Sequence, residues 1–448
     1  MSIQPPKSNF SEGANKAGDA IKKGVNDLLE MQENTAITLL TFLTFLTIIM
    51  AFLYYFYFNG TGTVAGIVLI IIVIIMFSVV GHALMGGAGV AAGCVIGILI
   101  GITIFTKMIN SKSTRNCNMM NEVYGTLNTA ISNVNLSQYD GCLYDYYIKT
   151  AYNCCSGGSY KNDYVSLCSL QDILKQGVRG LDFEIYSIDD QPVVATSTVD
   201  NYCVKETFNY VKFSDVLNTI VNNAFTETVP NPGDPIILHL RIKSENTKMY
   251  KNLSEMFGTI TQLLMTNYTY EDMGANGPQN FGAVKLSEML GKIVLIVDKS
   301  NTTCLCQDCS ETSECGDFYE FVNMTSNSSF MQLLRYGDIQ YTQTPDDLIN
   351  QNRQAMTIGI PDKGPNPPNP SSAVMRSLGV QMLAMRYQNV DANVEENDLF
   401  FNDNNSAFVL KPANMRAIVV TIPDATPQDP ALYYTTRTIS SPFYNLNV

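Results

Sequence analysis

The sequence predicts an α/β protein with a parallel sheet, preceded by a set of membrane-spanning helices. Two observations carry this prediction. From about residue 111 onward, strand-like and helix-like segments alternate, which indicates a parallel sheet that is either open or closed into a barrel. Before that point, a very apolar N-terminal quarter contrasts with the polar remainder of the 448-residue chain.

The N-terminal region begins with a polar tail over residues 1–35. Three apolar runs follow, over residues 36–58, 64–80 and 86–106, and each is long enough to cross ~30 Å of hydrocarbon as a helix. They predict a transmembrane region over residues 36–106 with three helices. The second break is rich in glycine, which membrane helices tolerate, so two spans are the alternative.

The cysteines bear on the compartment. All but one of the eleven follow residue 110, and an even number outside the apolar region favours disulfides formed in an oxidising setting. With several Asn-x-Ser/Thr triplets, they predict a multi-pass integral membrane protein whose large domain lies on the extracytoplasmic or lumenal side, or in a virion membrane. One cluster is predicted to form disulfides or, alternatively, to hold zinc; it consists of Cys304, Cys306, Cys309 and Cys315.

The segments after residue 111 alternate in type along the chain. Loops are expected over residues 301–330, which are polar and rich in cysteine, and over the proline-rich residues 361–372. Strands are predicted over residues 180–186, 192–196, 235–243, 292–298, 379–388 and 407–410, and helices over residues 213–223 and 251–265.

The first of these strands carries two carboxylates on one face. Leu181, Phe183 and Ile185 alternate with Asp182 and Glu184, so the two acids point the same way. Neighbouring acids are costly unless a metal, a cation or a proton holds them. The strand is therefore either part of a metal or active site, or an exposed edge strand whose acidic face is solvated.

Several segments, in collinear order, resemble the catalytic barrel of eukaryotic phosphoinositide-specific phospholipase C. The resemblance covers roughly residues 145–420 and implies a distorted TIM-type (β/α) barrel with its site at the C-terminal ends of the strands. The segments that carry it include Gly177-Val-Arg-Gly-Leu-Asp-Phe-Glu184, Phe213-Ser-Asp-Val-Leu217, Pro235-Ile-Ile-Leu-His-Leu-Arg241, Gly379-Val-Gln-Met-Leu-Ala-Met-Arg-Tyr-Gln388 and Phe408-Val-Leu-Lys-Pro412.

The resemblance also implies a division of the chain. The first half of the barrel is expected over residues 111–300 and a cysteine- and proline-rich linker over residues 301–375. The second half and a C-terminal tail are expected over residues 376–448.

The family's chemistry uses two histidines, one as general base and one as general acid, and this sequence lacks both. The position of the first, which precedes an asparagine, holds Tyr152. The position of the second, after a short apolar strand, holds Thr196. Because general acid–base groups carry the proton transfers of this reaction, we expect no catalytic residue at the family positions.

The family's calcium ligands are only partly kept. Asn153, Asp182 and Glu184 supply oxygen, with the Glu and Asp interchanged relative to the family, but the fourth position holds Arg241. A guanidinium is a permanent cation and would repel calcium. We expect Arg241 to replace the ion and to pair with the two carboxylates at a vestigial metal site.

His239 is the one histidine of the domain. It shares a strand face with Arg241, so the resemblance directs it into the barrel, deeper than the family's catalytic histidines. We interpret it as a hydrogen-bonded core residue, and it is the weak alternative candidate for catalysis.

These features predict a membrane-anchored, phospholipase-C-like pseudoenzyme with a structural or interaction role, in a viral or protist membrane. The alternatives are an active phosphoinositide phosphodiesterase that uses non-standard residues, and a non-catalytic module that binds a lipid headgroup. No cofactor is expected, or calcium if the site is active. The expected partners are a membrane, phosphoinositide lipid and unidentified proteins, but no nucleic acid, because the net charge is -13 and no basic stripe is present.

Overall fold

The computed structural model describes most of the chain after residue 61. The described residues are 22, 62–126, 129–199, 203–269, 280–301, 304, 317–417, 427–429 and 436–448.

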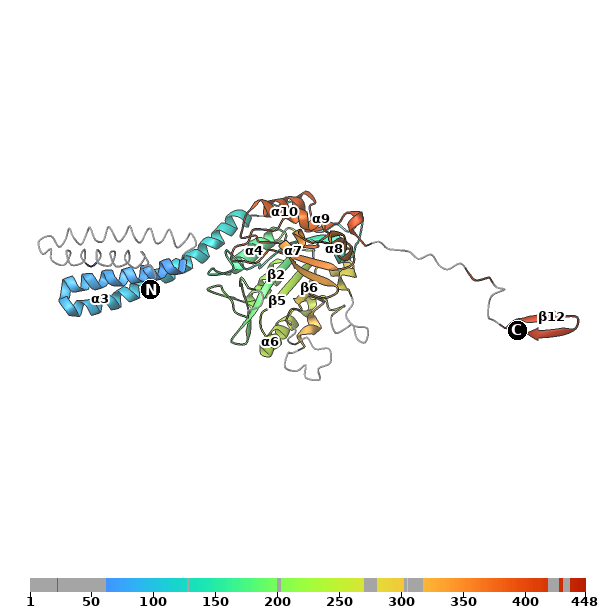
Figure 1. Cartoon of the computed structure of the whole chain (residues 1–448), viewed down its shortest axis with the longest axis horizontal. Coiled ribbons are helices and arrows are strands. Elements are labelled where there is room, and N and C mark those ends of the chain that lie inside the picture. The colour runs from blue at the N-terminus through green and yellow to red at the C-terminus, as the bar shows by residue number, and fades with distance from the viewer. Residues whose placement is uncertain are drawn as a thin grey trace, which may run out of the picture.

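Eight parallel strands form the barrel at the centre of the molecule (Figure 1). They follow one another in the order β7-β6-β5-β2-β1-β10-β9-β8, and the ends of this order, β7 and β8, lie in contact without a shared ladder. The barrel is therefore nearly closed, and this part of the predicted fold class is confirmed. The strands are β1 (Tyr146–Ala151), β2 (Gly180–Ile188), β5 (Ile236–Ile242), β6 (Ile293–Asp298), β7 (Met324–Ser326), β8 (Met331–Arg335), β9 (Met356–Ile360) and β10 (Met382–Met385).

Helix α5 (Phe213–Asn223) buries one apolar face. Its residues Phe213, Val216, Leu217 and Ile220 are buried, which is the spacing of a single helix face. Strand β5 is buried along its whole length, as expected of a central strand in a parallel sheet that is covered on both faces. The other helices are α4 (Leu167–Lys175), α6 (Thr247–Gly258), α7 (Tyr336–Gln340), α8 (Pro345–Asn352), α9 (Ser372–Ser377) and α10 (Ala392–Asp403).

Shorter elements complete the domain. Three strands join the barrel sheet by antiparallel pairing: β3 (Gln191–Ala195), β4 (Val211–Lys212) and β11 (Phe408–Leu410). The single-turn helices are η2 (Leu143–Asp145), η3 (Thr261–Leu263), η5 (Phe281–Ala283), η6 (Leu286–Met289), η8 (Phe318–Phe321) and η9 (Ala413–Met415).

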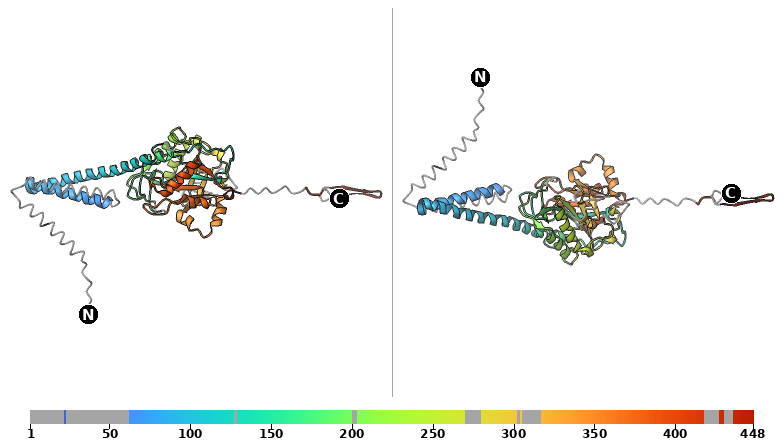
Figure 2. Two further views of the ribbon diagram at one scale, coloured as in Figure 1. Left: turned by 90° about the horizontal axis from the view of Figure 1, so that it is seen from above. Right: turned by 90° about the horizontal axis from the view of Figure 1, so that it is seen from below.

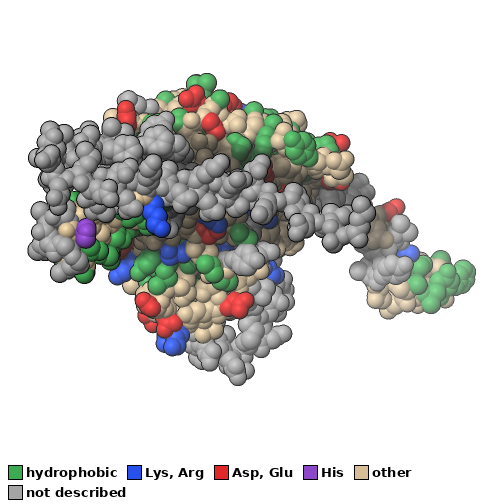
Figure 3. All heavy atoms as spheres, turned by 60° about the vertical axis from the view of Figure 1, so that its left-hand side comes forward, with side chains coloured by type: hydrophobic (Ala, Val, Ile, Leu, Met, Phe, Trp, Pro, Cys, Tyr) green, Lys and Arg blue, Asp and Glu red, His purple; other side chains and the backbone are tan. Residues whose placement is uncertain are grey.

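A separate hairpin lies at the C-terminus. It pairs β12 (Thr438–Ser441) with β13 (Tyr444–Asn447) and stands apart from the barrel (Figures 1 and 2). Its apolar side chains are exposed, with Phe443 93% accessible, and Figure 3 shows them in green at the right-hand end of the molecule.

The segment expected to be a linker, residues 301–375, contributes barrel strands. It contains β7, β8 and β9 together with α7 and α8. Strands of only three to five residues leave little periodicity in the sequence, which is why these three are not predicted from it.

Long helix α3 (Gly62–Tyr124) precedes the barrel and doubles back on itself (Figures 1 and 2). Its two arms approach closely through glycine. A Cβ atom on Gly93 would lie 2.0 Å from the Phe77 carbonyl oxygen, and one on Gly81 would lie 2.0 Å from that of Gly89. Beyond the arms, Met120 and Tyr124 pack into the barrel's hydrophobic core.

The predicted transmembrane region over residues 36–106 is wrong, and with it the multi-pass integral membrane localisation. Within the described ranges, no helix combines the length and the apolar character that a membrane span requires. The runs over residues 64–80 and 86–106 form one continuous helix, and its glycines let the two arms pack on each other. The run over residues 36–58 lies outside the described residues.

The cysteines are partly paired. A disulfide joins Cys117 of α3 to Cys168 of α4, so the predicted use of disulfides is confirmed at this position. Cys304 is also bonded in a disulfide, whereas Cys306, Cys309 and Cys315 lie outside the described residues. The free cysteines in the described part are Cys94, Cys142, Cys154, Cys155 and Cys203.

Candidate functional site

The candidate site lies where β1, β2 and β5 end at the mouth of the barrel. The parallel register places Asp182 beside His239 and Glu184 beside Arg241. Because alternate residues of a strand point to the same face, all four side chains lie on one side of the sheet. Close packing of the strands depends on Gly180, where a Cβ would meet Thr150 Oγ1 at 2.2 Å.

Arg241 is the centre of the site. Its Nη2 donates to Asp182 Oδ2 at 2.7 Å and to Asn153 Oδ1 at 2.9 Å. Its Nε donates to Asp182 Oδ1 at 3.0 Å, and its Nη1 donates to Glu184 Oε1 at 2.8 Å. The guanidinium therefore binds both carboxylates and the Asn153 amide at once, the forked geometry in which arginine pairs most strongly.

The remaining oxygen positions are filled from the surrounding chain. Asp182 Oδ2 accepts the Asn153 backbone N–H at 3.2 Å. Glu184 Oε2 accepts the Tyr186 hydroxyl at 2.7 Å and the Ser197 N–H at 3.0 Å. With His239 on Asp182 Oδ1, every carboxylate oxygen of the two acids has at least two partners.

Charge pairing governs the protonation of these groups. Burial alone would raise the pKa of the Asp182 carboxyl, but Arg241 and His239 hold that pKa well below its usual range. Burial alone would lower the pKa of Arg241, but Asp182, Tyr152 and Glu184 raise it above its ordinary value. Asp182 and Arg241 thus form a buried ion pair in which each group keeps the other charged.

His239 is fully enclosed and engaged at both ring nitrogens. Nδ1 lies 2.7 Å from Asp182 Oδ1, and Nε2 lies 2.9 Å from Ser326 Oγ. A Ser–His–Asp chain with these contacts is the arrangement that activates a serine nucleophile. Here, however, both Ser326 and His239 have 0% solvent exposure, so the serine meets no substrate in this conformation.

Tyr152 and Thr196 are the residues that the sequence resemblance aligns with the family's two histidines. The Tyr152 ring stacks under Arg241, whose Cζ lies 4.5 Å from the ring centroid, and burial raises the pKa of its hydroxyl. The Thr196 hydroxyl donates to the backbone oxygen of Tyr160 at 3.0 Å. Thr196 therefore holds the segment that carries Tyr160, and its hydroxyl is not directed at the two acids.

Three residues of the mouth were not predicted from the sequence. Tyr160 is 2% exposed; its ring meets the Tyr152 ring edge-on at 5.5 Å, and its N–H donates to Pro365 O at 2.8 Å. Arg386 donates through Nε to the Tyr160 hydroxyl at 2.9 Å, and Arg335 donates to the Tyr152 hydroxyl at 3.3 Å. The one available signal was a charged residue at the end of an apolar strand, which β8 and β10 both show.

The site does not fit calcium as it stands. Asn153, Asp182 and Glu184 offer oxygens of the type that calcium prefers, but the Arg241 guanidinium lies among them at hydrogen-bond distance. In the described part of the chain, no group of three or more His, Cys, Asp or Glu side chains is arranged to hold a metal. Of the cysteine cluster, only Cys304 lies in that part, and a disulfide occupies its sulfur.

Comparisons with known proteins bear on the barrel. The crystal structure of PLC21 from L. pealei is similar at 18% identity, with a TM-score of 0.49, over 65% of this chain and 39% of that one. That of PLC21 from S. officinalis is similar at 17% identity and a TM-score of 0.49, over 66% and 40%. This chain thus spans about two fifths of those proteins. No curated protein matches the sequence.

The family comparison covers the first half of the barrel. Residues 139–299 match the model of the phosphatidylinositol-specific phospholipase C X domain. This stretch contains β1, β2, β5 and β6 and the whole Asn153–Asp182–Glu184–Arg241 cluster. Residues 139–299 therefore form an X-domain-like segment, and the chain carries a barrel similar to that of phosphatidylinositol-specific phospholipase C.

Proposed function

We propose that this protein is a phospholipase-C-like pseudoenzyme, in which the barrel serves a structural or interaction role. One observation carries the proposal: every oxygen of Asp182 and Glu184 is held by the protein itself, and Arg241 supplies the positive charge that a calcium ion would otherwise provide. A buried site whose carboxylate oxygens are all engaged offers no open coordination position to a phosphate or a metal.

The missing proton-transfer groups support the same conclusion. A general acid and a general base are each worth about 10²–10⁴-fold in rate, and their positions hold Thr196 and Tyr152. Tyr152 is buried, which raises its pKa, so at neutral pH its hydroxyl stays protonated and accepts no proton from a substrate. Thr196 uses its hydroxyl to hold Tyr160.

The alternative is a phosphodiesterase that uses His239 as its base. The Ser326–His239–Asp182 chain favours this alternative, because it has the contacts of a nucleophile with its base. Against it, the two hydrogen bonds of His239 are made within the barrel wall, below Arg241 and away from solvent. We therefore interpret the chain as a buried polar network that stabilises the strand ends.

Hydrolysis of lipid vesicles tests the proposal directly. The full chain is incubated with vesicles that contain labelled phosphatidylinositol, with and without calcium, beside an active phospholipase C as positive control. We expect no release of labelled inositol phosphate above the rate without protein. Calcium-dependent release that is lost in Asp182→Asn would overturn the proposal.

The same vesicles separate an interaction role from a lipid-headgroup module. Sedimentation with vesicles that do or do not contain phosphoinositide reports binding without turnover. Retention on phosphoinositide vesicles alone would identify the barrel as a headgroup-binding module, whereas equal recovery in both supernatants supports a role toward another kind of partner.

A further inference from the structure

A pocket of about 460 Å³ lies at the end of the barrel opposite to the candidate site. It is formed where Tyr146, the first residue of β1, pairs with Leu410 of β11. The acids lie at the other end, beyond Ala151, so roughly 20 Å of strand separates the two places. From this pocket we infer a second site, one that binds a neutral sugar.

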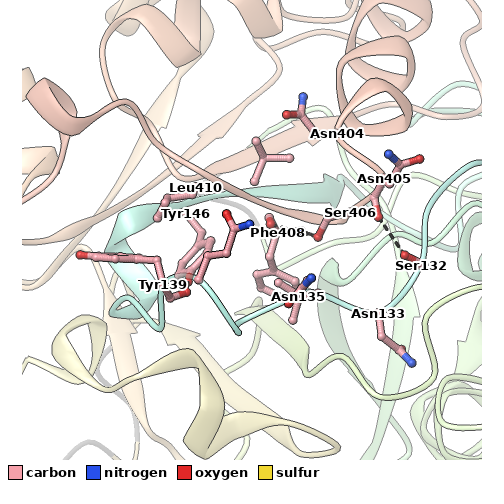
Figure 4. Close-up of a pocket in the computed structure, with 13 residues that line it drawn as sticks. Ser132, Asn133, Asn135, Tyr139, Tyr146, Asn404, Asn405, Ser406, Phe408 and Leu410 are labelled. Atoms are coloured by element: carbon pink, nitrogen blue, oxygen red, sulfur yellow. Dashed lines mark hydrogen bonds between the residues drawn. The ribbon is translucent and has the colours of Figure 1, made fainter.

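Two almost fully buried rings lie beneath a polar rim in the pocket. Tyr146 and Phe408 are both 2% exposed and lie in the middle of the group in Figure 4, with Tyr139 to one side and Asn404 and Asn405 to the other. The complete lining consists of Ser132, Asn133, Val134, Asn135, Gln138, Tyr139, Tyr146, Asn404, Asn405, Ser406, Phe408, Val409 and Leu410.

The charge of the lining selects the class of ligand. None of these residues carries a formal charge, so nothing compensates the desolvation of a phosphate, a carboxylate or an ammonium. Amides and hydroxyls instead offer both donors and acceptors to a neutral ligand. The pocket's volume is within the usual range for small-molecule sites.

Part of the rim's hydrogen-bonding capacity is unused. In the described part of the chain, the side-chain amides of Gln138 and Asn405 have no hydrogen-bond partner. The Asn135 amide oxygen accepts the Ser137 N–H at 3.0 Å, which fixes the side chain and leaves its NH₂ group available. The rim therefore presents amides at several points around an aromatic surface.

Tyr139 supplies a ring for stacking. Its side chain is 43% exposed, and the Arg416 guanidinium lies against one of its faces with Cζ 4.7 Å from the ring centroid. The cation–π contact orients the ring. Its other parts remain accessible to the C–H surface of a pyranose, which packs on aromatic rings as other apolar surfaces do.

The rim is also held in place by the backbone. The Ser132 N–H and hydroxyl donate to the Asn405 backbone oxygen at 3.1 and 3.2 Å, and the Ser406 hydroxyl donates to Phe408 O at 3.0 Å (Figure 4). The two walls are thereby joined before any ligand binds. The exposed Tyr139 ring, free amides, no charge and a fixed rim together fit a neutral mono- or disaccharide.

Saturation-transfer NMR with the full chain tests this inference. The protein is produced in a bacterial host, so that no attached glycan enters the pocket, and is mixed in turn with neutral mono- and disaccharides, myo-inositol and inositol phosphate. We expect transfer to at least one neutral ring compound and none to inositol phosphate. A signal for myo-inositol as well as for the pyranoses would also support the inference. It would show that the pocket accepts neutral rings that carry several hydroxyl groups, inositol among them.

Variants then tie the signal to the pocket. Gln138→Ala and Tyr139→Ala should each weaken binding by roughly fivefold or more, the equivalent of one hydrogen bond or one stacking contact. Tyr341→Ala, which removes a 71% exposed ring outside the pocket, should leave the affinity unchanged. Thermal melting verifies that each variant is folded.

Three outcomes would overturn the inference: no ring compound shows transfer, inositol phosphate binds better than the neutral compounds, or folded Gln138→Ala and Tyr139→Ala both bind as well as the unsubstituted protein.

Discussion

Arg241 determines what the barrel mouth can do. It provides four of the hydrogen bonds to the site residues and stacks on Tyr152, so it is at once the counter-ion and the packing centre of the cluster. The guanidinium holds the two acids together without a metal ion.

Removing this cation should destabilise the fold. Arg241→Ala leaves Asp182 and Glu184 buried without a counter-charge, and breaking a buried ion pair at one partner costs about 3–5 kcal/mol. Urea unfolding followed by circular dichroism measures the loss in the free energy of unfolding. Lys248→Ala is the control, because its side chain is 76% exposed and its ion pair with Asp190 is long, at 3.7 Å. Equal stability of both variants would contradict the role of Arg241.

Placing an acid at this position should create a calcium site. Arg241→Glu gives three carboxylates beside the Asn153 amide, an oxygen set of the kind calcium takes. We expect calcium to raise the melting temperature of this variant, since a ligand bound only by the folded state stabilises it. Inositol phosphate release should remain absent, because Tyr152 and Thr196 are unchanged.

Two proteins serve as controls for this experiment. The unsubstituted chain and Arg437→Glu, which makes the same charge change at an exposed position, should show no calcium-dependent shift. A folded Arg241→Glu variant with a melting temperature independent of calcium would show that the cluster is not a former metal site.

The site residues on β2 and β5 could be predicted from the sequence, whereas Ser326 on the distant strand β7 could not. Asp182, Glu184, His239 and Arg241 follow from strand alternation and from the register of neighbouring strands. Ser326 lies 87 residues beyond His239 and reaches it only through closure of the barrel, which no local pattern encodes.

At the scale of elements, prediction depended on length and apolar character. The strand expected over residues 180–186 corresponds to β2 (Gly180–Ile188), and that over residues 235–243 to β5 (Ile236–Ile242). Both are long and apolar on at least one face. β7 has three residues, of which two are Thr325 and Ser326, and its burial comes from neighbours distant in sequence.

Helix α3 shows the converse error. Its apolar residues were interpreted from hydropathy alone as spans, whereas its glycines serve close packing between two arms of one helix. A single sequence shows how apolar a segment is, but not what lies against it. The partner of an apolar face is a tertiary property.

The Cys117–Cys168 disulfide should contribute measurably to stability. It joins the end of α3 to α4 and closes a loop of 51 residues, for which the chain-entropy model gives about 4 kcal/mol and measurements typically give about 2–4 kcal/mol. We expect the double variant Cys117→Ser, Cys168→Ser to lose this amount of unfolding free energy, and therefore to unfold at a lower urea concentration. Cys203→Ser, at an exposed free thiol, is the matched control.

Reduction of the unsubstituted protein should lower its free energy of unfolding as the double substitution does. The same reductant should change the stability of the double variant only through any other disulfide. If the double variant and Cys203→Ser unfold at the same urea concentration, the bond does not hold α3 to the barrel.

At the scale of the whole molecule, the barrel was predictable because its motifs occur in the same order as its strands. Collinear segments from both halves constrain a topology even when each alone is weak, and the predicted strands correspond to β2, β5, β6 and β10 of the parallel sheet. The mouth was less predictable. Tyr160 and Arg386 lie more than 200 residues apart, and their contact exists only in the closed barrel.

The completed fold also buries a lysine, which makes stability depend on pH. Burial lowers the pKa of the Lys411 ammonium to about 7, with Asp145 opposing the shift, and its Nζ donates to Asn352 O at 2.8 Å. In the unfolded chain a lysine titrates near 10.4. Between about pH 7 and 10 the unfolded state thus binds more protons at this position, so this residue makes the free energy of unfolding rise with pH.

Replacing the lysine should remove that rise. Lys411→Met keeps a long apolar side chain, and Asn352 O retains a second donor in Gln381 Nε2 at 2.7 Å, so no buried acceptor is left bare. We expect the variant to gain stability over the unsubstituted chain at pH 7 and to lose this advantage by about pH 10, as Lys411 becomes neutral in both states. Urea unfolding at both pH values measures the difference in the free energy of unfolding between the variant and the unsubstituted chain. Because thiols and tyrosines that titrate in the same range are present in both proteins, their contributions cancel in this difference.

Lys248→Met, at an exposed position, is the control and should show the same pH dependence of stability as the unsubstituted protein. A constant gap between Lys411→Met and the unsubstituted chain at the two pH values would show that Lys411 stays charged inside the fold.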